Sequence, residues 1–316
     1  MGTSIRGHIA KTIIKAVSNA NPERVKDPAK KILLLDALKT RRACCGFKRE
    51  LFITPNGTKY EIHSKKGSKK NGNVFLYLHG GAYLYGLISL YTSHAKEWSK
   101  ITNGGEVFFI DYRCARPGKN LWPSQLDEAY DLWNHMINEL GYKEENIVVG
   151  GDSAGGNLTL ALLLKLRDEG RKMPRTAFCI SPWADMTGLG DSYTFNYALD
   201  DLFGNSKGKY TSELREKFMD CNVFTYCIGA DRFNPLVSPV YGDYHDFPPM
   251  MFTVGSHEIL LSDTMTIYNN LKKNNVPVEI SVGKEMFHIY PFFAWFIPEA
   301  KKSWKELMKF IEKQFK

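Results

Sequence analysis

The segment GGDSAGG, at residues 150–156, constrains the fold of this chain more than any other. A short apolar run, Ile147 to Val149, precedes it, and a longer apolar run with helical composition, Leu158 to Leu166, follows it. We therefore expect a buried strand and a buried helix with almost no loop between them. So abrupt a turn strains the backbone, and glycines allow the close approach because they lack a Cβ atom. In this setting Gly-x-Ser-x-Gly is the nucleophile elbow, which presents the hydroxyl of Ser153 above the sheet edge.

Strands and helices alternate along most of the chain. Apolar runs bounded by turn residues predict strands at 51–54, 59–63, 74–78, 107–110, 147–149, 177–180, 251–254 and 278–282. Helical patterns fall near 92–102, 124–140, 156–169, 262–274 and 299–315. This alternation predicts an α/β fold with a mostly parallel eight-stranded sheet covered on both faces. The first two strands are expected to form an antiparallel hairpin at one edge.

Two parts of the chain do not follow this alternation. Residues 1–45 show two helical patterns, and residues 185–249 form an aromatic-rich insertion with little strand character. Material inserted at the carboxyl end of a parallel sheet lies where such sheets bind ligands, so a helical cap is expected. The predicted division is N-terminal cap helices at 1–48, a first core part at 49–187, a cap insertion at 188–248 and a second core part at 249–316.

The predicted nucleophile requires a base. A serine hydroxyl is a weak nucleophile until a histidine, oriented by a carboxylate, takes its proton. In sheets with this elbow the chain order is serine, acid, histidine. Of the histidines after Ser153, His245 lies in the Tyr-rich insertion and His257 adjoins the candidate acids. His288 follows the last predicted strand, in GKEMFHIY, and is therefore the predicted base.

The acid is expected in the loop after the predicted strand at 251–254, which reads GSHEILLSD. Glu258 and Asp263 are both candidates. Glu258 comes four residues after the strand and lies within the loop. Asp263 is placed to cap or begin the next helix and would point elsewhere. Glu258 is therefore the favoured acid and Asp263 the alternative.

A third requirement is a set of donors for the negative charge that develops on the attacked carbonyl oxygen. Backbone N–H groups aimed at this oxygen each contribute a factor of about 10²–10³ in rate. The segment YLHGGAYLYG follows the third predicted strand, and its Gly80 and Gly81 let the main chain approach a substrate. Ala154, directly after the nucleophile, adds a donor. His79 is expected to orient this loop through hydrogen bonds without transferring a proton.

Three further residues near these motifs have structural as well as functional interpretations. Tyr83 and Trp183 are candidates for lining the acyl or alcohol pocket, and core filling is the alternative for both. Asp152 adjoins the nucleophile, but its side chain should point away from Ser153. We therefore expect Asp152 to be a structural hydrogen-bonding group.

Charge and composition restrict the expected partners. The chain has 316 residues, of which 43% are hydrophobic, and this suffices for a large core. It contains no apolar run of about 18 residues, so stable membrane insertion is not expected. The net charge is +8, but lysines gather in one predicted turn, at 65–70, and along the C-terminal helix, at 301–313. We expect solvated surfaces there and no nucleic-acid partner.

The N-terminus and the cysteines bear on location. The segment MGTSIRGHIAKTIIKAV lacks the uninterrupted apolar run and cleavage site of a signal peptide. As a helix it places Ile5, Ile9, Ile13 and Val17 on one stripe, for which a membrane-surface helix is one interpretation and a cap helix packed on its own protein the favoured one. The six cysteines show neither metal-ligand spacing nor the density of a disulfide scaffold. Free thiols, no metal and a cytoplasmic location are therefore expected.

Taken together, these motifs resemble a known family, the hormone-sensitive-lipase-like group of α/β-hydrolases, which includes carboxylesterases and arylacetamide-deacetylase-like enzymes. The matching segments are HGGAY at 79–83, DYR at 111–113, GDSAGG at 151–156, SPWAD at 181–185, VSPVYGD at 237–243 and VGSHEILLSD at 254–263. The resemblance covers nearly the whole chain.

The resemblance implies an α/β-hydrolase fold with a cap made from the N-terminal and inserted segments. It also implies a triad of Ser153, His288 and Glu258 and an oxyanion hole from Gly80, Gly81 and Ala154. Most members carry aspartate where Glu258 stands, and some use glutamate. Members often form dimers, so a homodimer is among the expected assemblies.

The sequence thus predicts a cofactor-independent serine hydrolase, a carboxylesterase that cleaves small to medium carboxylic esters through an acyl-enzyme. An amidase or deacetylase with the same triad is the alternative, and paired ester and amide substrates separate the two by their kcat/KM ratio. A non-catalytic small-molecule receptor is a third hypothesis, because this fold also supports binding alone. The presence of His288 speaks against the receptor.

Overall fold

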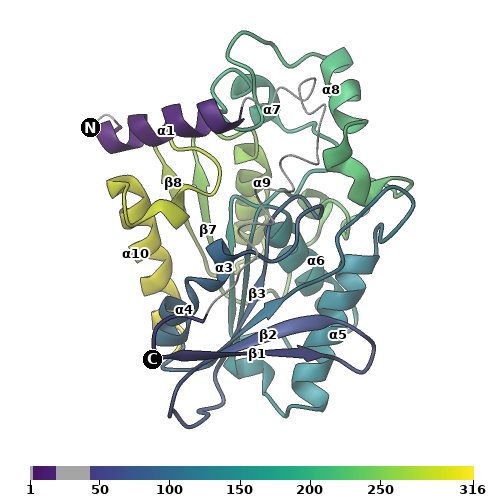
Figure 1. Ribbon diagram of the computed structural model, residues 1–316. Helices are drawn as coiled ribbons and strands as arrows, with labels where there is room; N and C mark the ends of the chain where they lie inside the picture. Colours follow the sequence, from purple (N-terminus) through teal and green to yellow (C-terminus); the bar gives the residue numbers. More distant parts are fainter. Residues whose placement is uncertain (1–2, 19–42) are drawn as a thin grey trace.

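The centre of the protein is an eight-stranded sheet, seen in a computed structural model that describes residues 3–18 and 43–316 (Figure 1). The strand order is β1-β2-β4-β3-β5-β6-β7-β8. The pairs β1·β2 and β2·β4 are antiparallel, and all other neighbours are parallel. The predicted sheet and its edge hairpin are confirmed. The strands are β1 Phe47–Ile53, β2 Lys59–Lys65, β3 Val74–Leu78, β4 Glu106–Ile110, β5 Ile147–Asp152, β6 Thr176–Ile180, β7 Met250–Gly255 and β8 Val278–Gly283.

Helices cover both faces of the sheet, because its central strands are apolar on both sides (Figure 1). On one face Phe75 of β3 packs in a cluster with residues of α4 and α10. On the other face Leu76 packs with residues of α5, α6 and α9. These helices are α4 Ala95–Ile101, α5 Ser124–Asn138, α6 Ala154–Asp168, α9 Leu261–Lys273 and α10 Pro298–Lys313. Shorter ones are α3 Ser89–Thr92, η2 Glu144–Asn146 and η5 Tyr290–Phe293.

The junction between β5 and α6 is a single residue. β5 ends at Asp152 and α6 begins at Ala154, so the helix starts two residues earlier than predicted. Ser153 between them has φ 52° and ψ −120°, in the region that non-glycine residues rarely occupy. A Cβ atom on Gly155 would lie 2.0 Å from the carbonyl oxygen of Leu78. Glycine at 155 is therefore what lets α6 begin directly against the end of β3.

The insertion between β6 and β7 lies at the carboxyl end of the parallel strands (Figure 1). Its elements are α7 Asp191–Phe195, α8 Ser212–Met219, η3 Asn222–Cys227 and η4 Pro239–Tyr241. Buried side chains of this insertion, such as Tyr193, Phe224 and Tyr226, join the core cluster on the α6 face. The insertion is therefore packed onto the sheet domain and is not a detached lobe.

The first helix, α1 Ile5–Ser18, packs through a different face from the one its stripe suggested. Ile5 and Ile9 are 80% and 46% exposed, whereas Gly7 and Ala10 are buried. Ser4, just before the helix, donates from its N–H and its hydroxyl to Glu299 of α10, at 2.6 and 2.8 Å. The small residues allow close contact, so α1 does pack on its own protein. The second helix predicted within 1–45 falls largely outside the described residues.

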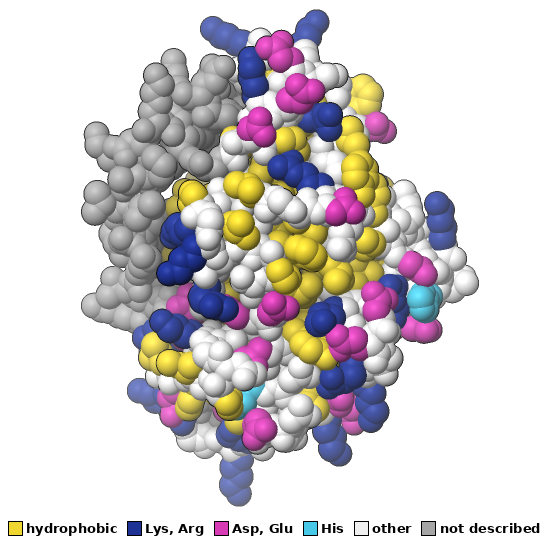
Figure 2. Space-filling model, turned by 90° about the vertical axis from the view of Figure 1, so that its right-hand side faces the viewer, with side chains coloured by type: hydrophobic (Ala, Val, Ile, Leu, Met, Phe, Trp, Pro, Cys, Tyr) yellow, Lys and Arg dark blue, Asp and Glu magenta, His cyan; other side chains and the backbone are white. Residues whose placement is uncertain are grey.

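The surface mixes charges of both signs with apolar groups. On the face shown in Figure 2, hydrophobic side chains gather across the middle, and basic and acidic side chains are interspersed around them. All six cysteines are free thiols. Within residues 3–18 and 43–316 no helix has both the length and the apolar content needed to cross a bilayer.

The packing of α6 gives a stability prediction. Leu162 is fully buried in the core cluster, and truncation to alanine leaves a cavity there, so Leu162→Ala should lower the free energy of unfolding by about 2–5 kcal/mol. The matched control is Leu51→Ala on β1, where the side chain is 63% exposed, with an expected change within about 0.5 kcal/mol. Urea unfolding measures both, and equal losses would contradict this packing.

Candidate active site

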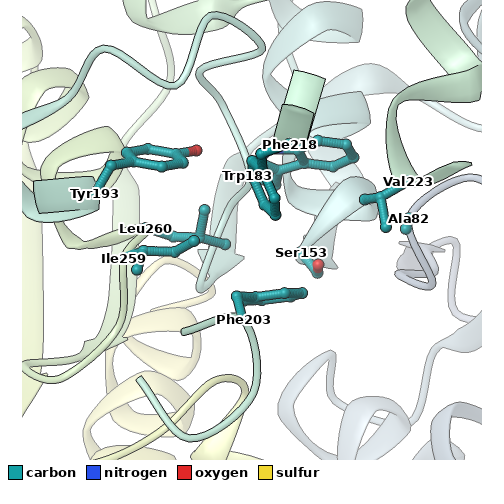
Figure 3. A pocket seen from close by; sticks show the side chains of 9 residues that line it. All are labelled: Ala82, Ser153, Trp183, Tyr193, Phe203, Phe218, Val223, Ile259 and Leu260. Carbon is teal, nitrogen blue, oxygen red and sulfur yellow. The ribbon is translucent and has the colours of Figure 1, made fainter. Parts of the chain in front are cut away.

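Ser153 lines a small apolar cavity and is 8% exposed (Figure 3). Its backbone is held on both sides, because its N–H donates to the carbonyl of Ile180 at 2.9 Å and its carbonyl accepts from Trp183 N–H at 3.0 Å. These bonds join the elbow to the end of β6 and the residues after it. The hydroxyl position is thus fixed by the sheet.

Glu258 and His288, predicted as acid and base, lie side by side in the structure. Glu258 follows β7 and His288 follows β8, and parallel strands bring their following loops to one edge. The distance between His288 Nδ1 and Glu258 Oε2 is 2.8 Å, which fits a hydrogen bond donated by the ring. Both side chains are buried, with the Glu258 carboxylate wholly inaccessible. The carboxylate therefore fixes the ring orientation.

Ser181 is a contributor that the sequence analysis missed. Its hydroxyl donates to Oε1 of Glu258 at 2.8 Å and accepts from the N–H of Ile289 at 3.1 Å. The N–H of Gly255 also donates to Oε1 of Glu258. One hydroxyl thus connects the acid to the residue after His288. The sequence does carry a signal for this residue, because the segment SPWAD at 181–185 directly follows a predicted strand and begins with Ser181. The sequence analysis assigns no role to this serine.

Asp263, the alternative acid, binds the backbone after β6 instead of His288. Its Oδ2 accepts from the N–H groups of Ala184 and Asp185 at 2.8 and 2.9 Å. Complete burial raises the pKa of Asp263 well above its ordinary value, and the neighbouring Asp185 carboxylate raises it further. The structure therefore brings Glu258, and not Asp263, to His288.

Phe203 of the insertion contacts His288 and also lines the cavity that contains Ser153. The Phe203 ring lines the cavity beside Ser153 (Figure 3). It meets the His288 ring edge-on, with centroids 5.0 Å apart. Within the described part of the chain no hydrogen bond joins the Ser153 hydroxyl to His288. Such bonds are commonly long in unliganded enzymes and shorten when substrate binds.

The glycine loop after β3 requires a correction to the predicted donors. The N–H of Gly80 donates to Oδ1 of Asp152 at 2.9 Å, and the Tyr77 hydroxyl donates to the same oxygen at 2.6 Å. Gly80 N–H is therefore engaged and does not face an oxyanion in this structure. The next residues, Gly81 and Ala82, have φ of 104° and 53°, which turns the chain over Ser153. Asp152 is a structural hydrogen-bonding group, as the sequence indicated.

His79 is buried beneath the same loop. Its Nδ1 lies 2.7 Å from the carbonyl oxygen of Gly80, and its ring stacks on Tyr112 with centroids 4.0 Å apart. The Tyr112 hydroxyl donates to the carbonyl of His79 at 2.7 Å. These contacts fix the loop, in agreement with the orienting role expected for His79.

The two aromatic candidates fall in different surroundings. Trp183 lines the cavity that contains Ser153 (Figure 3). Tyr83 is fully buried, stacks on Tyr226 with centroids 3.8 Å apart, and donates to Oδ1 of Asn157 at 2.7 Å. Tyr83 thus connects the glycine loop to α6 and to the insertion, and its side chain lies outside the cavity lining.

The cavity itself is small and almost entirely apolar. Its volume is about 20 Å³, which holds about one water-sized group. The insertion supplies Tyr193, Phe203, Phe218 and Val223 (Figure 3). The sheet domain supplies Ala82, Ser153, Trp183, Ile259 and Leu260. The insertion therefore supplies four of the nine residues that line the cavity.

The sheet order, the serine elbow and the paired acid and histidine after the last two strands define an α/β hydrolase. Residues 75–292 match the protein family described as the α/β hydrolase fold, more than two thirds of the sequence, and the chain belongs to that family. Its relatives are named as ester-cleaving enzymes, and it is an ester hydrolase of this fold.

Two curated relatives illustrate the sequence similarity. An acetyl-hydrolase of Streptomyces hygroscopicus is 33% identical over 75% of this chain and 74% of its own length. An esterase of Acinetobacter venetianus is 28% identical over 75% of this chain and 74% of its own length.

Solved structures resemble the whole chain. An esterase/lipase from an uncultured bacterium has a TM-score of 0.82 and 27% identity, covering 98% of this chain and 99% of its own. An esterase from the bacterial hormone-sensitive lipase family has a TM-score of 0.79 and 27% identity, with complete coverage of both chains. The suggested family resemblance is therefore confirmed.

The burial of Asp152 makes a stability prediction with a defined sign. Burial raises its pKa from 3.8 to about 6, although bonds from Tyr77 and Gly80 lower it. The folded state thus holds this proton more tightly than the unfolded state, and the corresponding stability is lost as the pH rises through about 6. Asp152→Asn removes this titration. Between pH 4.5 and 7.5 its stability relative to the native protein should therefore improve by about 2 kcal/mol.

Urea unfolding of both proteins at the two pH values measures this difference. Other titrating groups, including Asp200, are common to both proteins and cancel. A stability difference that does not change with pH would show that Asp152 ionises normally.

Proposed function

We propose that this enzyme hydrolyses esters of short carboxylic acids, acetyl esters above all, through an acyl-enzyme on Ser153. The observation that carries the proposal is the apolar cavity of about 20 Å³ directly beside the Ser153 side chain. An acetyl methyl group fills a space of this size, whereas longer acyl chains require the walls to move. The reaction needs no cofactor.

In the proposed first step the Ser153 oxygen attacks the ester carbonyl while Nε2 of His288 takes the hydroxyl proton. The hydrogen bond from Nδ1 of His288 to Glu258 leaves Nε2 as the base and stabilises the imidazolium that forms. His288 then gives the proton to the departing alcohol oxygen. In the second half a water molecule, deprotonated by His288, attacks the acyl carbonyl. His288 then returns this proton to the Ser153 oxygen as the bond to the acyl group breaks and the acid is released.

The negative charge on the carbonyl oxygen is assigned to the N–H groups of Gly81, Ala82 and Ala154. Gly80 is excluded from this set because Asp152 engages its N–H. The positive φ at Gly81 and Ala82, together with the start of α6 at Ala154, is the support for this assignment. Ala154 also contributes the positive end of the helix dipole.

The names of relatives support the short acyl group. The Streptomyces relative is an acetyl-hydrolase, and a relative from Pseudomonas putida that is 26% identical is an ethyl acetate hydrolase. We assign residues 1–48 and 188–248 to the cap, and the support for the second range is that it supplies four of the residues that line the cavity beside the nucleophile. The cap thereby sets the acyl length.

Replacing the nucleophile tests the chemistry. Ser153→Ala should reduce kcat for p-nitrophenyl acetate by about 10³-fold or more, because no acyl-enzyme can form. A fluorophosphonate probe should label the native protein and not the variant. Thermal unfolding controls for folding, and native turnover by a folded variant would refute the assignment.

The cavity wall can be tested separately. Phe218 lines the cavity from α8, and Phe218→Ala should raise kcat/KM for p-nitrophenyl hexanoate relative to the acetate by about tenfold, because it opens space beside the acyl group. The matched control is Phe233→Ala, a 58% exposed residue of the same insertion. An unchanged chain-length profile in Phe218→Ala would place the acyl group elsewhere, and paired amide substrates check the amidase alternative.

A further inference from the structure

Asp200 of the insertion is a buried carboxylate that the proposed reaction does not use. Asp200 lies between α7 and α8 and is 5% exposed. Its Oδ1 accepts from the N–H groups of Leu202 and Phe203 at 2.8 and 2.9 Å. Its Oδ2 accepts from the N–H of Ile259 at 2.8 Å. One carboxylate therefore joins the insertion to the loop that carries the acid.

This connection reaches the residue next to Glu258. Ile259 directly follows Glu258, so the bond from Asp200 fixes the backbone on the carboxyl side of the acid. Asn196 also holds this backbone, because its amide donates to the carbonyl of Ser256 on the amino side of the acid at 3.0 Å, and to the carbonyl of Glu258 itself at 2.8 Å. The backbone around the acid is thus held from both directions by side chains of the insertion.

The other oxygen of Asp200 sets the position of Phe203. The Phe203 ring meets the edge of the His288 ring at 5.0 Å and lines the cavity beside Ser153. One oxygen of the Asp200 carboxylate thus binds the loop that carries Glu258, and the other binds the backbone of Phe203, whose ring contacts His288. Burial also raises the pKa of Asp200 to about 6, so keeping this group charged at neutral pH is costly. A charge maintained at such cost is consistent with a specific role.

We propose that Asp200 is a positioning residue for the reaction, holding the acid loop and Phe203 so that Glu258 and His288 stay aligned. The inference rests on the proposed function of these two residues. It assigns the insertion a second task beside forming the cavity wall. Loss of this bridge leaves the nucleophile and the oxyanion donors in place and loosens only the acid and the base.

Asp200→Asn tests the inference, because it keeps the size of the side chain and replaces one accepting oxygen by an NH₂ group. Either the acid loop or Phe203 then loses its acceptor. We expect kcat for p-nitrophenyl acetate to fall by about 10-fold to 10²-fold, with KM changed by less than about threefold.

The pH profile separates positioning from a merely structural role. His288 must be neutral to act as a base, and a well-placed Glu258 carboxylate favours its protonated form. A displaced Glu258 therefore stabilises the imidazolium less, and the acid limb of the kcat/KM profile should move to lower pH in Asp200→Asn. A simple loss of folded protein would scale the profile without moving it.

The matched control is Asp191→Asn, an exposed aspartate at the start of α7 in the same insertion, for which kcat and the acid limb should stay native. If Asp200→Asn does not fold, Asn196→Ala serves instead, because it removes the two bonds from the Asn196 amide to the backbone around the acid. It should give the same fall in kcat and the same shift of the acid limb to lower pH. A native acid limb in the folded variant overturns the inference. If Ser153→Ala is inactive and Asp200→Asn has native kcat and a native acid limb, the positioning role is refuted and the proposed function stands. If Ser153→Ala is active, the proposed function itself is refuted.

Discussion

The sharp backbone turn at Ser153 is the constraint on which the rest of the structure depends. A φ of 52° at this residue lets β5 end and α6 begin without a loop. Such a turn persists only where its surroundings over-determine it. Here the backbone of Ser153 is bonded to Ile180 and Trp183, and Gly155 lies against the carbonyl of Leu78. The elbow, the end of β3 and the end of β6 are therefore a single packed unit.

Around this unit, the proposed acid and the proposed base come from loops that the parallel sheet brings together. Glu258 and His288 follow adjacent strands, and their hydrogen bond is shielded from water. Ser181 bonds to Glu258 and to the residue after His288, so the end of β6 supports both loops. Low solvent access strengthens these polar contacts, and it also makes each unpaired group costly. Both carboxylate oxygens of Glu258 accordingly have hydrogen-bond partners.

The N-terminal segment, outside the sheet, also contacts the loops that carry Glu258 and His288. Lys11 of α1 lies 3.0 Å from Nδ1 of His257, and the Thr3 hydroxyl donates to Glu285. His257 is next to the acid, and Glu285 is three residues before the base. Burial, followed by the Lys11 charge, lowers the pKa of His257, so this contact favours a neutral ring. The start of the chain and the insertion thus contact the acid and base loops by separate routes.

The sequence by itself determined the strands, the main helices and the elbow at Ser153, because apolar periodicity and glycine spacing are local properties. Chain order singled out Glu258 and His288, which the structure places at hydrogen-bond distance from each other. Only the tertiary structure decided which N–H groups are free. The N–H of Gly80 is taken by Asp152, a residue 72 positions away. Only the tertiary structure likewise showed the contact of Ser181 with Glu258, the exposure of Ile5 and Ile9, and the position of Tyr83 outside the cavity. Each of these depends on contacts between distant segments, and hydrogen-bond partners across a fold leave no periodic signal in the chain.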